Sequence, residues 1–304
     1  MRIAVVFPGQ GSQTEGTGRP WRDHPAWSVV EQAEDATGLP LAHLLLDASS
    51  ADLGNTRDAQ LSVLLGSLLA WRALEPTVDP TALVAVAGHS LGQITALIAS
   101  GCIDLSDGIR LAVARAEASA ASQARRPGAM LALLGATEPQ AIEACAAAPD
   151  RAWIANVNGG GQIVIGGEPE VLPSVAERAE SLGVRRVRPL AVDGAFHTPL
   201  MQPAADALRP ALDATTFREP HVPIVTNDGE TVTGATGWPD RLTRHLVAPV
   251  RWDLVVQRLQ DLGAESLIEA GPGTTLSSLA ARIAPDLTAR TVSSPDDLPT
   301  AVVR

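Results

Sequence analysis

The chain has neither lysine nor tyrosine, and its 304 residues include only two cysteines and three phenylalanines. All 23 basic residues are therefore arginine, and 34 acidic residues bring the formal net charge to −11. Nucleic acid attracts basic surfaces, so a chain this acidic is a poor nucleic-acid binder. Cys102 and Cys145 stand in apolar or alanine-rich stretches. We interpret them as small core or helix residues, not as a disulfide or a metal site.

Long apolar runs are also missing. None reaches the roughly 18 residues that a membrane-spanning helix needs. The strand-like residues 2–6 begin at once, without the charged and apolar regions of a signal peptide. We therefore expect a cytoplasmic protein with no membrane segment. The hydrophobic fraction of 45% is enough for a large core and leaves room for a subdomain.

Strand-like and helix-like stretches alternate along most of the chain, and this alternation predicts a parallel α/β sheet. The predicted strands are residues 2–6, 83–87, 129–134, 162–166, 184–190, 222–226 and 266–269. The predicted helices include residues 59–73, 107–123, 171–182, 201–213 and 252–262.

The middle third has a different order. From Met130 to Leu190 the pattern is strand, helix, strand, strand, helix, strand, with the extra helix near 138–147 and the extra strand near 152–157. This is the split βαβ order of a ferredoxin-like unit. We therefore predict a small domain at 127–192, inserted between the two parts of a large domain at 1–126 and 193–304.

Residues 88–92 read Gly-His-Ser-Leu-Gly and lie between an apolar strand and a helix-forming stretch. This is the setting of a nucleophile elbow, in which a tight turn projects the serine at the N-terminus of a helix. The free N–H groups of that turn can stabilise an oxyanion. Ser90 is therefore the candidate nucleophile. The alternative is a tight turn whose serine only caps the helix.

A serine nucleophile needs a base, and the chain offers six histidines. His89 adjoins Ser90 but points elsewhere across the elbow. His24, His43 and His245 lie in polar or helical surroundings, so we expect them at the surface, and His221 can simply begin a strand. His197 lies in a loop between a strand and a helix, where α/β folds place reactive groups, and it is the favoured base.

The glycine-rich residues 7–13, Phe-Pro-Gly-Gln-Gly-Ser-Gln, follow the first strand. Their glycines permit close backbone approach, and Gln10 can offer an N–H. The segment is too short for a dinucleotide fingerprint and no lysine follows it. A simple structural turn is the alternative.

Taken together, these motifs resemble malonyl-CoA:acyl-carrier-protein transacylases and the acyltransferase domains of polyketide synthases. The resemblance covers essentially the whole chain. It rests on residues 7–13 and 88–92, with further matches at 155–162, 194–197, 249–252 and 269–273. It implies an α/β-hydrolase-like large domain with an inserted ferredoxin-like small domain.

The resemblance also implies a set of site residues. Ser90 would be acylated and His197 would be its base, oriented by a backbone carbonyl near Arg251 and not by an aspartate. Gln10 and the N–H of Leu91 would form the oxyanion hole. Arg115 would bind the free carboxylate of malonate, and Gln60 and Phe196 would line the site.

The implied reaction is a two-step transfer from acyl-CoA to the phosphopantetheine of an acyl carrier protein, with no metal and no bound cofactor. We expect a monomer. The carrier is generally acidic, so docking needs a basic patch. The candidates are Arg125, Arg126, Arg185, Arg186 and Arg188, although a solvated strand edge would look the same.

Three positions depart from the family pattern. Ala116 and Ser119 stand where many relatives have glycine and methionine, and Gln93 stands where glutamate is common. Ser119 predicts a larger or more polar acyl pocket, whereas Phe196 favours malonyl by restricting branching. The alternatives are transfer of a larger carboxyacyl group, an editing hydrolase, a malonate-decarboxylase subunit or a non-catalytic scaffold. Retention of Arg115 counts against the hydrolase, and the intact Ser90, His197 and Gln10 count against the scaffold.

Overall fold

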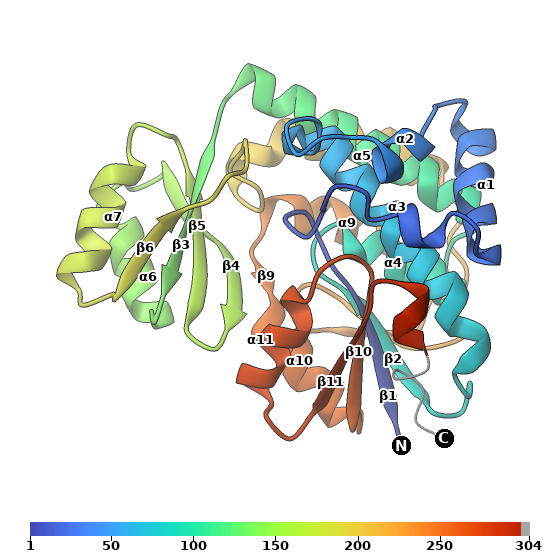
Figure 1. Ribbon diagram of the computed structural model, residues 1–304. Helices are drawn as coiled ribbons and strands as arrows, with labels where there is room; N and C mark the ends of the chain where they lie inside the picture. The colour runs from blue at the N-terminus through green and yellow to red at the C-terminus, as the bar shows by residue number, and fades with distance from the viewer. Residues whose placement is uncertain (299–304) are drawn as a thin grey trace.

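Two β-sheets organise the chain into a mixed α/β fold, and the computed structural model describes residues 1–298 (Figure 1). The larger sheet has the strand order β11-β10-β1-β2-β7-β8. Its strands are β1 (Ile3–Phe7), β2 (Leu83–Gly88), β7 (Ile224–Val225), β8 (Thr231–Val232), β10 (Ser266–Ala270) and β11 (Thr288–Val292). Neighbouring strands are parallel except for the β7–β8 pair.

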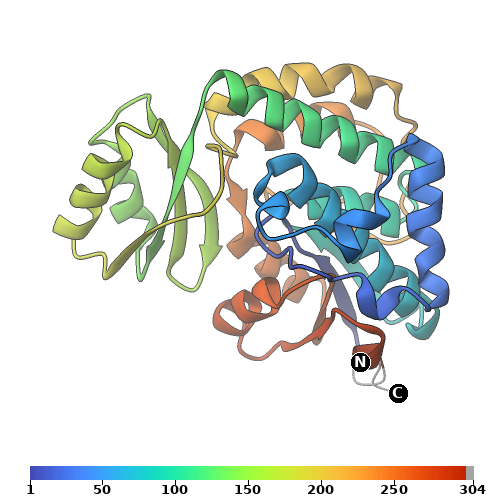
Figure 2. The same cartoon turned by 45° about the horizontal axis from the view of Figure 1, so that its top comes forward.

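Helices cover both faces of this sheet, and its strands are therefore buried on both sides. Ile3 and Val5 pack on one face, and Ala4 and Val6 pack on the other, as the two-residue period of a strand requires. The first face is covered by α1 (Ser28–Thr37), α2 (Ala42–Leu46), α3 (Thr56–Leu74), α4 (Gly92–Ala99), α5 (Leu105–Arg125), α8 (Gln202–Ala214) and α9 (Trp238–Val247). The second is covered by α10 (Trp252–Asp261) and α11 (Thr275–Ile283). Figure 2 shows α5 and α8 running side by side across the large layer.

The smaller sheet has the order β6-β3-β5-β4-β9. Its elements are β3 (Ala129–Leu134), α6 (Glu138–Cys145), β4 (Ala152–Gly159), β5 (Gln162–Gly167), α7 (Leu172–Ser181), β6 (Arg186–Pro189) and β9 (Val250–Arg251). Strands β6, β3, β5 and β4 pair antiparallel, whereas β9 joins β4 in parallel from the second half of the chain. Helices α6 and α7 cover one face, and the other face turns toward the large sheet.

Short 3₁₀ helices connect these elements: η1 (Arg19–Trp21), η2 (Pro25–Trp27), η3 (Asp52–Gly54), η4 (Glu75–Thr77), η5 (Pro199–Met201) and η6 (Pro295–Asp297). Within residues 1–298, no helix has both the length and the apolar character that crossing a membrane requires. Cys102 and Cys145 are free thiols, and burial raises their pKa values to about 11 and about 12.

The predicted strands and helices are found at or near the expected positions, but several further elements were not predicted. Strand β11 (Thr-Ala-Arg-Thr-Val) has no apolar run because it forms an edge of the large sheet. Helices α1, α9 and α11 were also missed. The strand expected at 222–226 is only the two-residue β7.

Glu269 holds the start of α11 from inside the large sheet. Its side chain is fully buried, and its two carboxylate oxygens accept hydrogen bonds from the N–H groups of Leu276 (3.1 Å) and Ser277 (2.8 Å). Burial raises the pKa of Glu269, while these donors oppose the shift. The first turn of a helix has N–H groups without helical partners, so the carboxylate satisfies donors that would otherwise be buried and unpaired.

We expect Glu269→Ala to destabilise the protein by about 2–4 kcal/mol, because two buried N–H groups lose their acceptor. Glu269→Gln keeps one carbonyl oxygen and should cost about half as much. Urea unfolding of the two variants and the wild type measures this difference. Equal losses for the two variants would show that the acceptor role is not what stabilises α11.

Candidate active site

Ser90 lies at a sharp turn between β2 and α4, and its backbone is left-handed with φ at +52°. Few residues other than glycine adopt this conformation, and it is stable only where the surroundings enforce it. The flanking glycines allow the turn to close. A Cβ on Gly88 would lie 2.0 Å from the backbone of Gly92, and one on Gly92 would lie 2.1 Å from the Phe7 carbonyl oxygen. The elbow therefore requires glycine at both positions.

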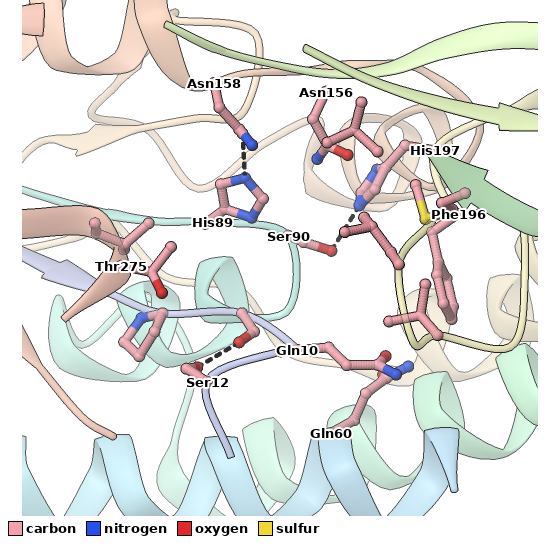
Figure 3. A pocket seen from close by; sticks show the side chains of 18 of the residues that line it. Gln10, Ser12, Gln60, His89, Ser90, Asn156, Asn158, Phe196, His197 and Thr275 are labelled. Atoms are coloured by element: carbon pink, nitrogen blue, oxygen red, sulfur yellow. Dashed lines mark hydrogen bonds between the residues drawn. The ribbon is translucent and has the colours of Figure 1, made fainter. Parts of the chain in front are cut away.

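Two side chains converge on the Ser90 hydroxyl. The Nε2 atom of His197 lies 2.6 Å from Ser90 Oγ, and Arg115 Nη2 donates a hydrogen bond to the same oxygen at 2.9 Å. Figure 3 shows Ser90 and His197 pointing toward each other across the pocket. His197 comes from the loop before η5 and is also left-handed, with φ at +60°. The structure thus brings together the serine, histidine and arginine that the sequence indicated.

The orientation of His197 is set by a helix end. Its Nδ1 atom lies 2.8 Å from the carbonyl oxygen of His245, which can only accept, so Nδ1 carries the proton and Nε2 is free to accept one from Ser90. His245 lies in the last turn of α9, where carbonyls have no helical partner and the helix dipole is negative. This carbonyl takes the place that an aspartate has in other serine sites.

Two expectations about this region need correction. The orienting carbonyl belongs to His245 and not to the immediate neighbourhood of Arg251, whose side chain pairs with Asp253 and Glu138. His245 was expected at the surface, yet only 6% of it is exposed. The hydrophilic sequence of α9 suggested an exposed helix. The helix is amphipathic, however, and the polar side chain of His245 lies on its buried face.

Burial and charge keep the imidazole of His197 neutral. Burial, helped by the nearby guanidinium of Arg115, lowers the pKa of His197 to about 3. Burial also lowers the pKa of Arg115 to about 10, which leaves the guanidinium charged at neutral pH. The site therefore holds a neutral base and a buried cation on either side of one hydroxyl.

These groups open into a cavity of about 410 Å³ between the two sheets. Gln10, Gln60, Arg115 and Phe196 line it, as expected, and Arg115 is the only Arg, Asp or Glu among the described residues that do so. Its Nη1 donates to Gln60 Oε1 at 2.5 Å. The small sheet and α11 complete the wall with Met130, Asn156, Asn158, Val164, Thr275, Leu276 and Leu279.

The remaining expected residues differ in their placement. Leu91 is the N-cap of α4, and its N–H makes no hydrogen bond within residues 1–298, so it is available beside Ser90. Ser119 is 1% exposed and does not line the cavity, and its hydroxyl has no partner in the described part of the chain. The structure therefore does not bring Ser119 to the site.

His89 has a place that the sequence did not predict. It is half-buried and lines the cavity, and its Nε2 lies 3.1 Å from Asn158 Oδ1 on the small sheet (Figure 3). Burial lowers the pKa of His89. In the part of the chain that the structure describes, no group of three or more His, Cys, Asp or Glu residues could hold a metal ion.

Comparison of the sequence and the fold with known proteins places the chain in a family. Residues 4–288 match the acyl transferase domain family. The malonyl CoA-acyl carrier protein transacylase of Escherichia coli K12 is 34% identical over 99% of both chains.

Two solved structures are also similar. A malonyl-CoA:acyl carrier protein transacylase from Xanthomonas oryzae superposes with a TM-score of 0.93 at 34% identity, covering 99% of this chain and 98% of that one. A malonyl-transacylase solved in complex with a type II polyketide synthase acyl-carrier protein has a TM-score of 0.94 at 32% identity, covering 99% of each chain. The chain is therefore an acyltransferase and belongs to the acyl transferase domain family.

Proposed function

We propose that the chain transfers a malonyl group from CoA to the phosphopantetheine thiol of an acyl carrier protein, through an acyl-Ser90 intermediate. The observation that carries this proposal is the placement of Arg115 within hydrogen-bond distance of Ser90 Oγ. A free carboxylate two bonds from an acyl-serine carbonyl would fall beside this guanidinium, whose planar fork suits bidentate binding. The names of the relatives support the same substrates.

In the first half-reaction, Ser90 Oγ attacks the thioester carbon while His197 Nε2 accepts the hydroxyl proton. The Oγ–C bond forms, the C–S bond breaks, and His197 returns the proton to the departing CoA sulfur. In the second half-reaction, the carrier thiol gives its proton to His197 and attacks the acyl-serine. The Oγ–C bond then breaks and the proton returns to Ser90.

Both half-reactions pass through an oxyanion, so one set of donors serves both. We assign this role to Gln10 and to the N–H of Leu91. The unbonded Leu91 N–H at the start of α4 supports the assignment. The negative end of α9 at His197 Nδ1 stabilises the imidazolium that forms in each step.

We describe the fold as an α/β-hydrolase-like large domain at 1–126 and 193–304, with a ferredoxin-like small domain at 127–192. The five parallel strands and the β6-β3-β5-β4 order support this division. The chemistry needs no resident cofactor, and CoA and the carrier act as substrates in the cytoplasm.

The carrier would dock at the open side of the cavity. Arg185, Arg186 and Arg188, on or next to the edge strand β6, are largely exposed and supply positive charge on an acidic protein. Arg126 is less suited to this role because it is paired with Glu168. Charge of this kind raises the rate of encounter with an acidic partner.

Malonyl remains the favoured acyl group. Phe196 lines the cavity, which supports a limit on substitution at the α-carbon. The burial of Ser119 outside the cavity weakens the case for a larger acyl group. Arg115 has no use in a hydrolase for monocarboxylic acyl groups.

Incubation with malonyl-CoA should add one malonyl mass to the wild type and none to Ser90→Ala. Ser100→Ala, a matched change just after α4, should still be acylated. Intact-protein mass spectrometry reads this directly, since a chain without lysine has no side-chain amines to acylate. An adduct on Ser90→Ala would place the nucleophile elsewhere. In a parallel incubation with acetyl-CoA, a wild type that accepts acetyl and not malonyl, and passes it to water, would favour the hydrolase.

Arg115→Ala should lower kcat/KM for malonyl-CoA by tenfold to a few hundredfold, because a charge-assisted double hydrogen bond contributes about 1.5–3 kcal/mol or more. The use of acetyl-CoA should stay level or rise. Arg110→Ala, an exposed position on the same helix, should change neither. Equal losses for both donors would mean that Arg115 supports the fold and does not read the substrate.

The acid limb of kcat/KM should lie well below pH 6.5, because only the neutral imidazole of His197 accepts the serine proton and its pKa is lowered to about 3. In Arg115→Met, which lacks the nearby cation, the limb for acetyl-CoA should move to higher pH. Rates between pH 4 and 8, with circular dichroism to verify folding, give the profile. A wild-type limb between pH 6 and 7 would rule out this account of His197.

A further inference from the structure

Buried hydrogen bonds behind the cavity form a closed circuit through the proposed catalytic pair. The Ser90 N–H donates to Asn227 Oδ1 at 3.2 Å, and Asn227 Nδ2 donates to Gln93 Oε1 at 2.6 Å. His245 Nδ1 lies 3.1 Å from the same Gln93 oxygen. The His245 carbonyl accepts from His197, which contacts Ser90 and closes the circuit.

The three residues of the circuit behind Ser90 and His197 are isolated from solvent. Gln93, Asn227 and His245 are 1%, 3% and 6% exposed. These residues surround a cavity of only about 20 Å³, whose remaining walls include Ile94, Leu111, Leu208, Leu212, Leu242 and Leu246. Arg115 also lines this cavity, and Gln93 Nε2 has no hydrogen-bond partner within residues 1–298. A space this small leaves the bonded groups few alternative partners, which favours the observed arrangement.

Hydrogen-bond chemistry fixes the direction of every link. Asn227 Oδ1 receives an N–H, so its amide nitrogen faces Gln93, which must then present its oxygen. Because that oxygen can only accept, His245 Nδ1 must be the donor. One atom, Gln93 Oε1, therefore joins the half of the circuit that holds Ser90 to the half that holds His197.

The other ring nitrogen of His245 faces a carboxylate. Its Nε2 lies 3.1 Å from Asp228 Oδ2, a contact that is an ion pair only when both ring nitrogens carry protons. Although burial opposes ionisation of Asp228, its contacts with His245, Thr226 and Arg244 keep the pKa of this carboxyl well below its usual range. The imidazole of His245 thus lies between Gln93 on α4 and Asp228 in the loop after β7.

We propose that Gln93, Asn227 and His245 are positioning residues that set Ser90 and His197 at reacting distance. The proposal rests on the proposed roles of Ser90 and His197. The pair has no aspartate, and its two members come from segments 107 residues apart. The circuit links the backbone of Ser90 to the carbonyl of His245 and so fixes their relative positions. This matters because misplacement of reacting groups by about 1 Å can cost about 100-fold in rate.

The first test is Gln93→Met, which keeps the length of the side chain and removes the shared acceptor. We expect kcat for malonyl transfer to fall by roughly 10- to 100-fold with KM within about threefold, because the loss lies in alignment and not in binding. Gln93→Glu retains an oxygen acceptor and should recover most of the rate. The matched control is Thr95→Val, a fully buried α4 position whose hydroxyl has no partner in residues 1–298, and its kcat should be unchanged.

A spectroscopic readout separates positioning from general stability. In ¹⁵N-histidine-labelled wild type, His197 should show a protonated Nδ1 and an unprotonated Nε2. Gln93→Met should give a mixture of tautomers. Asn227→Asp keeps the acceptor for the Ser90 N–H and removes the donor to Gln93, so it tests the same link if Gln93→Met does not fold.

An unchanged kcat in Gln93→Met, or an equal fall in Thr95→Val, would overturn the inference. So would an intact His197 tautomer in the slowed variants. The wild type first has to form the malonyl-serine adduct. If that adduct is missing, the proposed function fails, whereas a normal adduct with a fully active Gln93→Met refutes only the positioning circuit.

Discussion

The contact between Ser90 Oγ and His197 Nε2 is the constraint around which the rest of the molecule is arranged. Both residues occupy the left-handed region of backbone space, which costs of order 1–3 kcal/mol for each residue without glycine's freedom. Neither would hold this conformation in isolation. The structure enforces it on one side by the two glycines of the elbow and on the other by the end of α9.

Use of a helix end in place of an aspartate changes the electrostatics of the site. A carboxylate would bring a full negative charge next to the imidazole and raise its pKa, whereas a carbonyl supplies only a partial charge. Arg115 can therefore stay close to the serine without a competing internal anion. The site stays cationic on its acyl side and neutral at its base, an arrangement suited to a substrate that brings its own carboxylate.

The elbow could be read from the sequence because its chemistry needs glycines at fixed positions around the serine, between a strand and a helix. Residues 59–73 and 107–123 were recognisable as helices from their composition and pattern. His245 could not be found this way, since it acts through a backbone carbonyl that every residue possesses. Gln93 and Asn227 are 134 positions apart, and no local pattern connects them. The sequence showed that Ser119 departs from the family pattern. It could not show that the Ser119 side chain lies outside the cavity, because that depends on how α3 and α5 pack.

Strand β9 has a mechanical consequence. It belongs to the small sheet through its pairing with β4, yet α9 and α10 on either side of it pack against the large sheet. Its Arg251 N–H also donates to the Asn227 carbonyl at 2.7 Å. A rotation of the small sheet would thus strain the backbone that joins α9 to α10. The separation of the two sheets, which sets the width of the cavity, and the orientation of the His197 imidazole are therefore coupled. The cavity entrance cannot widen freely while His197 stays aligned with Ser90.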